Sequence, residues 1–335
     1  MNRGLRDVLI ALVVVVVAGG LAMIVAGANP IDGFGQLLDG ALGNPSEIAE
    51  TLVQTTALLF PALGIAFAFR AGLFNIGAEG QLILGGMAAG VVGVIVPLPA
   101  ILAIPLTLAA GAFAGGCWGG VAGFFRARFG ANEVIATLML NVVALLLATY
   151  LIGGPFKQAG ATASETASLP LAAQLPSIFP DSRLTIALPL ALALALVLRW
   201  VFMRTVFGYE LRAAGEAPEA ARRAGIDLAR TAFVAMATSG AIAGLGGATI
   251  VMGMLHRFNT GLSPGYGFIG IAVALVGNLD PIGICIASFA FGILQSGGIA
   301  MQAMANVPRD VVSLVEGLVI VALAGRRVVA SRRNA

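Results

Sequence analysis

The chain alternates along its whole length between long apolar runs and short polar stretches. An α-helix of about 20 apolar residues is long enough to cross the hydrocarbon core of a bilayer. The pattern therefore predicts an all-α polytopic membrane protein with about ten spanning helices. The expected spans cover residues 8–27, 49–69, a glycine-rich third that ends near 96, 100–124, 132–153, 184–203, 231–255, a short eighth at 268–278, 282–303 and 310–324.

The composition is that of a membrane protein. Of the 335 residues, 59% are hydrophobic and only 10% are charged, with a mean hydropathy of +0.98, whereas soluble domains carry about 25% charged residues. Charged side chains are too few to cover a water-exposed surface, so we expect a single transmembrane domain over residues 1–335. The net charge of +3 does not indicate nucleic-acid binding, because the arginines are spread over short loops.

The placement of basic residues predicts the orientation in the membrane. Loops on the cytoplasmic side carry an excess of lysine and arginine. With the N-terminus inside, 15 of the 19 basic residues fall on the cytoplasmic side. The four on the outside are Lys157, Arg183, Arg257 and Arg309. We therefore expect both termini and the loop at 204–230 to face the cytoplasm.

The longest polar run lies in that loop, at residues 209–227. Pro218 suits the first position of a short helix, and Gly225 suits the position just after its end. Glu219 can pair with Arg222 one turn later. A helix of about seven residues is marginal by itself, so something is expected to pack on it. Two interpretations stay open, a solvated connector between two spans and a docking helix for a soluble partner.

Residues for catalysis are scarce. One histidine and two separated cysteines do not supply the three or four ligands that a zinc site needs. A phosphate-binding P-loop needs a lysine, and the only lysine, Lys157, lies in an expected outer loop. We expect no cofactor in this chain and no enzymatic activity. If ATP drives the protein, another polypeptide must hydrolyse the ATP and must bind a cytoplasmic surface of this chain.

Two segments resemble each other weakly. Residues 57–96 and 239–279 each contain a span, a glycine-rich break and a short glycine-rich span. The predicted topology puts the two breaks on opposite sides of the membrane, which is the pattern of an inverted repeat whose interrupted helices line a central path. The alternative is that the glycines only allow close helix packing.

Charged residues within or beside the spans default to a functional hypothesis, since burying charge in a bilayer is costly. Glu79, Glu133 and Asp280 lie near the ends of predicted spans and can instead pair with loop arginines or cap helices. Glu316 lies deeper, in the tenth span, where it either contacts another helix or carries a proton.

Amide and aromatic side chains also occur in or beside the spans. Uncharged amides suit a hydroxyl-rich neutral solute, and aromatic rings suit stacking on a nucleobase or sugar ring. Each such residue is an alternative source of helix–helix hydrogen bonds. The candidate substrate-path residues are Phe74, Asn75, Glu79, Gln81, Asn132, Asn141, Tyr266, Phe268 and Asn278.

Three stretches resemble a known family. Residues 69–81 (FRAGLFNIGAEGQ), 131–141 (ANEVIATLMLN) and 265–278 (GYGFIGIAVALVGN) are similar to permease subunits of bacterial ABC importers. The branch is the one that carries branched-chain amino acids, ribose-type sugars and nucleosides, and the chain looks closest to its nucleoside (simple-sugar) permeases. The resemblance covers nearly the whole chain in order.

The resemblance implies a type II importer fold with ten helices and a two-subunit pore formed with a second permease, expected to be a different chain. It also implies an ATPase subunit that binds ATP and Mg²⁺, a periplasmic or lipid-anchored solute-binding protein, and a location in the cytoplasmic (inner) membrane.

The family's cytoplasmic loop motif, Glu-Ala-Ala, three residues and Gly, is matched by residues 219–225. This match implies that the short helix docks on the ATPase subunit. The candidate coupling residues are Glu210, Arg212, Gly215, Glu216, Pro218, Glu219, Ala220, Ala221, Arg222 and Gly225. The competing hypothesis is an ion-coupled secondary transporter that uses Glu79 or Glu316 as its proton site.

Overall fold

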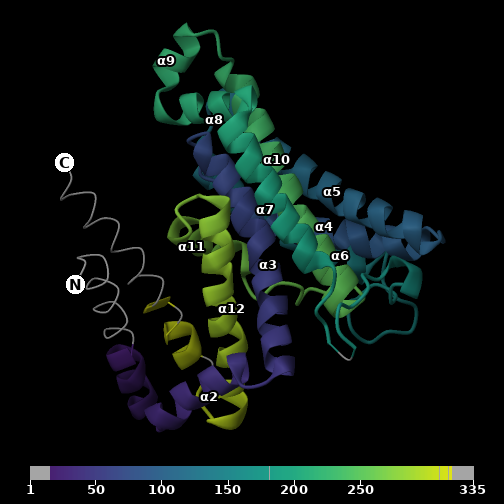
Figure 1. The fold of residues 1–335 in the computed structure, drawn as a ribbon. Helices are drawn as coiled ribbons and strands as arrows, with labels where there is room; N and C mark the ends of the chain where they lie inside the picture. The colour runs from purple at the N-terminus through teal and green to yellow at the C-terminus, as the bar shows by residue number, and fades with distance from the viewer. Residues whose placement is uncertain (1–15, 181, 309, 316, 319–335) are drawn as a thin grey trace. The chain divides into compact units, whose positions relative to one another are not determined.

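The computed structural model describes residues 16–180, 182–308, 310–315, 317 and 318, which are mostly helical (Figure 1). Among these residues, extended backbone segments pair in two isolated β-bridges. The helices are α2 (Pro30–Leu42), α3 (Pro45–Arg70), α4 (Ala78–Ile95), α5 (Ala100–Phe129), α6 (Glu133–Gly153), η1 (Leu171–Ala173), α7 (Ala187–Arg204), α8 (Val206–Glu216), α9 (Pro218–Arg223), α10 (Leu228–Ile250), η2 (Val251–Leu255), α11 (Tyr266–Val276) and α12 (Pro281–Met304).

The all-α polytopic fold is confirmed, but the count of ten spans is not. The described residues hold seven helices long and apolar enough to cross a membrane, or eight if Val16–Val25 and α2, bent by 117°, form one span. The predicted short eighth span corresponds to α11, an apolar helix of 11 residues. The predicted first and tenth spans lie partly outside the described residues. Glu316 is itself outside them.

The chain divides into two compact units, one formed by residues 1–55 and 289–335 and the other by residues 56–288. In the first unit, Met23, Leu37 and Met301 belong to a cluster of buried apolar side chains. Its helices also exchange polar contacts, since the Thr51 hydroxyl donates to the Ala41 carbonyl over 2.8 Å. The expected single domain stays a prediction.

The core of the second unit is built from α4, α5 and α10, which pack closely along glycine-rich faces. Gly115 of α5 lies against Gly240 of α10, and Gly85 of α4 lies against Gly244. A Cβ atom at any of these positions would overlap the backbone of the neighbouring helix. Small residues thus let the helix backbones approach one another, as they commonly do in membrane proteins.

Both glycine-rich breaks belong to the second unit and begin at opposite ends of it (Figure 1). The first begins after Arg70, where Gly72 lies against Gly215 of α8. The second begins at His256, whose carbonyl accepts a hydrogen bond from Leu169 N in the long α6–α7 connection. This arrangement agrees with the expected inverted repeat, which stays a prediction because a symmetry relation between the two segments is not tested.

Candidate functional site

The coupling stretch forms two helices, α8 and α9, which lie between the C-terminal end of α7 and the N-terminal end of α10 (Figure 1). Thr205 ends α7 and starts α8, because its hydroxyl accepts a hydrogen bond from Gly208 N at 3.1 Å. Pro218 is the first residue of α9, as the sequence predicted. The prediction of one short helix was therefore incomplete, since it missed the 11-residue α8.

The end of α9 confirms the expected role of Gly225. Its φ of +86° is left-handed, a conformation that favours glycine. Gly225 N donates to Arg222 O at 3.1 Å, and Ile226 N donates to Ala221 O at 3.0 Å. These two bonds form a Schellman motif. Glu219 and Arg222 approach to 3.6 Å, but both side chains are exposed, so this pair contributes little stability.

Most of α9 faces away from the rest of the chain. Ala221 is 3% exposed and is the buried residue of this helix. The exposed residues of α9 are Pro218, Glu219, Ala220, Arg222 and Arg223. A six-residue helix has too few internal hydrogen bonds to be stable alone in water, so its exposed surface is well suited to be covered by a partner.

In contrast, α8 is held against the ends of α7 and α3. Leu211 is fully buried, and Gly208 lies against the backbone of Val201 and Phe202. Gly215 lies against the Arg70 carbonyl and the Gly72 amide. A side chain at position 215 would separate these backbones. The remaining coupling candidates on α8, which are Glu210, Arg212 and Glu216, are partly or fully exposed.

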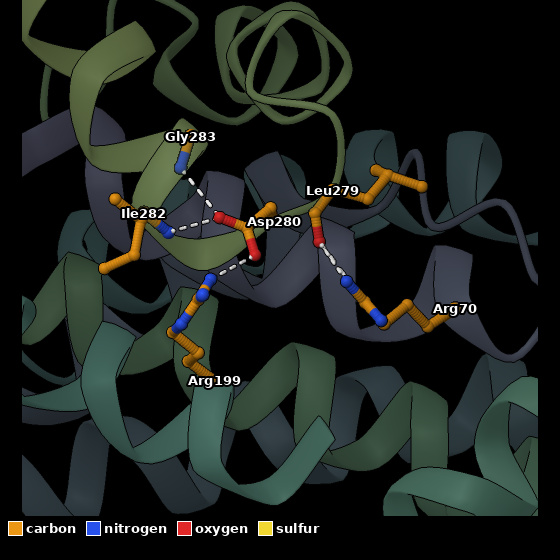
Figure 2. Close-up of polar contacts among 6 residues, drawn as sticks. All are labelled: Arg70, Arg199, Leu279, Asp280, Ile282 and Gly283. Atoms are coloured by element: carbon orange, nitrogen blue, oxygen red, sulfur yellow. Dashed lines mark hydrogen bonds and ion pairs between the residues drawn. The ribbon is translucent and has the colours of Figure 1, made fainter. Parts of the chain in front are cut away.

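Arg70 links this contact to the turn between α11 and α12 (Figure 2). Its Nε and Nη2 donate to the Leu279 carbonyl at 3.3 and 3.1 Å. The same guanidinium lies over the ring of Phe202, 4.4 Å from the centroid, which is within the range of a cation–π interaction. Leu279 adopts a φ of +53°, unusual for a residue other than glycine.

Asp280 secures the same turn (Figure 2). Its Oδ2 accepts hydrogen bonds from Ile282 N and Gly283 N, both at 3.1 Å, which caps the start of α12. Its Oδ1 accepts from Arg199 Nη1 of α7 at 2.7 Å. The interpretation that Asp280 pairs with an arginine and caps a helix is confirmed. Because α8 follows α7, the contacts of Arg70 and Asp280 close a ring from α8 through α3 and the α11–α12 turn back to α7.

The first break carries a buried polar cluster. Asn75 Nδ2 donates to Gln81 Oε1 at 2.9 Å, and Gln81 Nε2 donates back to Asn75 Oδ1 at 3.1 Å. Asn75 also donates to Ser239 Oγ at 2.7 Å, and this hydroxyl donates to Gly64 O at 2.6 Å. Ser239 lies eleven residues into α10, about 16 Å along its axis. Asn75 therefore lies well inside the helix bundle.

The starts of α4 and α11 meet beside this cluster. Glu79 Oε2 accepts a hydrogen bond from Gly267 N at 2.7 Å, and Ser263 also hydrogen-bonds the carboxylate. Asn141 of α6 accepts from Gly80 N and donates to Ile76 O, both at 2.9 Å. The two breaks thus begin at opposite ends of the unit and converge at these helix starts, a feature that the sequence did not reveal.

The other path candidates lie elsewhere. Asn132 caps α6 by accepting from Val134 N at 2.9 Å. Asn278 is exposed in the α11–α12 turn, with a φ of +61°. Tyr266 is buried next to Gly267. Phe74 is exposed and packs on Phe69, and Phe268 is also exposed.

Comparison with known proteins decides the family. The family model described as branched-chain amino acid transport system / permease component matches residues 47–324. The chain belongs to this permease family. It is therefore a multi-pass transport subunit and not an enzyme, as the resemblance implied.

The relatives of this permease are named as subunits for nucleosides and a sugar. It is 37% identical to a guanosine ABC transporter permease protein of Bacillus subtilis, over 94% of this chain and 92% of the relative. It is 34% identical to a nucleoside ABC transporter permease protein of Lactococcus lactis, over 96% and 91%. It is also 34% identical to a glucose ABC transporter permease protein of Haloferax volcanii, over 91% and 83%.

In Bacillus subtilis and Lactococcus lactis a second permease protein named for the same substrate also matches this permease, at 28% identity. No solved structure matches the chain significantly. The described part of the permease contains no group of three or more histidine, cysteine or carboxylate side chains placed to hold a metal ion.

Two hydroxyl groups of the permease lie at the helix breaks although nothing in the sequence pattern marks them. Ser239 is a single hydroxyl in an apolar span, and Thr137, whose hydroxyl accepts from Ile76 N at 3.3 Å, is another. Neither side chain disturbs the hydrophobic pattern of its helix. Glu133, in contrast, pairs with Arg126 at 3.6 Å, so its expected pairing with a loop arginine is confirmed.

Proposed function

We propose that this chain is the membrane-spanning subunit of an ATP-driven ABC importer for nucleosides, with simple sugars as the near alternative. The proposed substrate class rests on similarity, over almost the full length of the chain, to permeases named for guanosine and nucleosides. The relative named for glucose keeps sugars as the alternative.

The proposed partner of α9 is a separate ATPase subunit that holds ATP and Mg²⁺. Support comes from the exposed side chains of Pro218, Glu219, Ala220 and Arg222, which α9 presents beyond the rest of the unit. Movement of the ATPase would displace α9 and α8 together. The contacts of Gly215 and Arg70 would then carry the displacement to α3 and the α11–α12 turn.

The assembly we propose contains a second permease, forming a heterodimeric pore, and a periplasmic or lipid-anchored solute-binding protein. The paired permease proteins of two other organisms support the heterodimer. The pore would lie in the cytoplasmic membrane with both termini and α9 on the cytoplasmic side, as the basic residues predict.

The proposed substrate path passes the convergence of the two breaks. Asn75, Glu79, Gln81 and Asn141 are buried there, and they hydrogen-bond one another or the backbone. A solute that reaches them must exchange these bonds for its own hydroxyl and base contacts. Transport is then a shift between conformations in which the cluster is closed and open, biased by nucleotide binding to the ATPase.

Charge reversal at α9 tests the docking role. The Glu219→Arg variant should insert normally but lose co-purification of the ATPase subunit and solute-stimulated ATP hydrolysis. The matched control is Lys157→Glu, a charge reversal in the exposed α6–α7 connection, which should leave both unchanged. Normal co-purification and hydrolysis in Glu219→Arg would refute the docking role.

A second candidate function is ion-coupled secondary transport. The buried carboxylate of Glu79, held between two helix starts, favours it. It predicts that the chain alone, in liposomes with a pH gradient, accumulates radiolabelled guanosine. The ABC importer predicts no accumulation until the ATPase subunit and ATP are present, so this single measurement separates the two.

A further inference from the structure

An apolar groove with a volume of about 740 Å³ runs between α5 and α10 on the surface of the second unit. Its walls include three aromatic rings, those of Phe113, Phe124 and Phe233. Small residues form its floor, because α5 and α10 approach each other closely here through glycines. The floor residues include Gly116, Gly120, Ala237 and Ala241. Thr238 is the one hydroxyl residue in the lining and the other lining residues carry no charged, hydroxyl or amide side chain, so an apolar chain can lie along the groove.

The length of the groove corresponds to one leaflet of a bilayer. On α5 it extends from Ala112 to Phe124, which is about 18 Å along a helix axis. Half of a bilayer's hydrocarbon core is about 15 Å thick. The groove therefore begins near one end of the spanning helices and ends near the middle of the membrane.

Two arginines lie beyond the end of the groove that is formed by Phe124 and Phe233, away from the middle of the membrane. Arg128 follows Phe124 by four residues and so lies on the same face of α5, and Arg230 precedes Phe233 by three residues on α10. The two helices run antiparallel, since Gly123 lies against Phe233 and Gly115 lies against Gly240. Both arginines therefore lie at the same end.

Neither arginine is neutralised by a carboxylate. Both side chains are exposed, and within the described ranges neither Arg128 nor Arg230 takes part in an ion pair. Arg126, two residues before Arg128, differs because it pairs with Glu133. Two unpaired guanidinium groups at the mouth of an apolar groove match a negatively charged headgroup joined to an acyl chain.

We propose that this groove binds one anionic phospholipid, with an acyl chain between α5 and α10 and the headgroup phosphate on Arg128 and Arg230. By the predicted orientation these arginines face the cytoplasm, so the lipid belongs to the inner leaflet. A second protein helix on the same face is the competing occupant, and it would cover the groove without any dependence on the lipid headgroup. The site is independent of the transported solute.

Cys117 provides a direct reporter, because it lines the groove and is exposed. The full-length chain carrying Cys285→Ala, so that Cys117 is the only thiol, is purified in detergent and supplemented with phosphatidylglycerol or phosphatidylcholine. Alkylation of Cys117 by N-ethylmaleimide is followed by mass spectrometry. Phosphatidylglycerol should slow alkylation at least about fivefold relative to phosphatidylcholine, because the bound acyl chain covers the sulfur.

Two variants complete the test. Arg128→Ala combined with Arg230→Ala should abolish the protection by phosphatidylglycerol, whereas Arg204→Ala, which removes an exposed arginine at the end of α7, should preserve it. Thermal unfolding of each variant without added lipid confirms that the fold is intact. Equal alkylation rates in both lipids would overturn the proposal. Protection that survives the double substitution, or that requires a second permease instead of lipid, would also overturn it.

Discussion

The convergence of the two helix breaks and the helix α9 are both polar regions of an apolar chain, but they use polarity in opposite ways. At the convergence, the buried side chains of Asn75, Gln81 and Asn141 are bonded to one another, to Ser239 or to backbone groups. On α9, the polar side chains are exposed and only Ala221 is buried.

Of these two regions, only the exposed polar residues of α9 can contact a soluble protein partner without a change in the fold. The buried amides stabilise irregular backbone that lipid could not solvate. The charges of α9 contribute almost nothing to folding, because water screens them. Substitutions should therefore separate the two regions by their effects on stability and on partner binding.

The largest expected loss of stability comes from Gly267→Ala. A Cβ atom here would overlap the backbone of Ala78 and Glu79, which forces the starts of α4 and α11 apart. We expect a loss of about 3 kcal/mol, measured by thermal unfolding in detergent. Gly153→Ala is the control, because nothing lies within 4 Å of its added methyl group. Equal stability of the two variants would contradict this packing.

The next largest effect is expected for Asn75→Ala. Truncation leaves the buried Gln81 amide without its reciprocal partner and removes the bond to Ser239. We expect a loss of about 2 kcal/mol, since orphaned buried polar groups cost about 1–3 kcal/mol each. Asn278→Ala, at an exposed amide, serves as the comparison. If Asn75→Ala leaves the melting temperature unchanged, the amide is not part of the structural cluster.

A smaller effect is expected for Asp280→Ala. The substitution removes the cap of α12 and the pair with Arg199. We expect a loss of about 1 kcal/mol, most of it from the cap, because the ion pair is partly exposed and screened. Arg199→Ala should cost less than half as much. A larger loss for Arg199→Ala would show that the ion pair, and not the cap, secures the turn.

The smallest effect on stability is expected for Glu219→Gln. Its exposed pair with Arg222 contributes less than about 0.5 kcal/mol. If α9 docks on an ATPase subunit, the same substitution should weaken ATPase co-purification although the melting temperature does not change. A destabilised Glu219→Gln variant would mean that α9 supports the fold, which would remove the contrast between the two regions.

The sequence was a good guide wherever the signal was local. Pro218 and Gly225 bracket α9 as predicted, because first-turn proline and left-handed glycine depend only on nearby backbone. The helix α8 was missed because its glycines at positions 208 and 215 lower helix propensity. Both glycines are instead required by close backbone contacts, Gly208 with Val201 and Phe202 of the preceding α7 and Gly215 with Arg70, which is distant in the sequence.

The candidate site could be predicted only in part for a similar reason. Asn75 and Gln81 stand out as amides beside a span, but the hydrogen bond from Asn75 to Ser239 joins positions 164 residues apart. Nothing in the local pattern indicates that contact. Asn132 and Asn278 have the same side-chain chemistry as Asn75, yet one caps a helix and the other lies in an exposed turn. Residue type alone does not distinguish these environments.

The contact between Gly215 and Gly72 has a mechanical consequence. Side chains at an interface can change rotamer and absorb a small displacement, but these two segments touch through their main chains. The junction between α8 and the end of α3 is therefore rigid. A shift of α8 by a fraction of an ångström must move the end of α3 by a similar amount. Replacing either glycine by a larger residue would separate the two backbones and change the angle between the two helices.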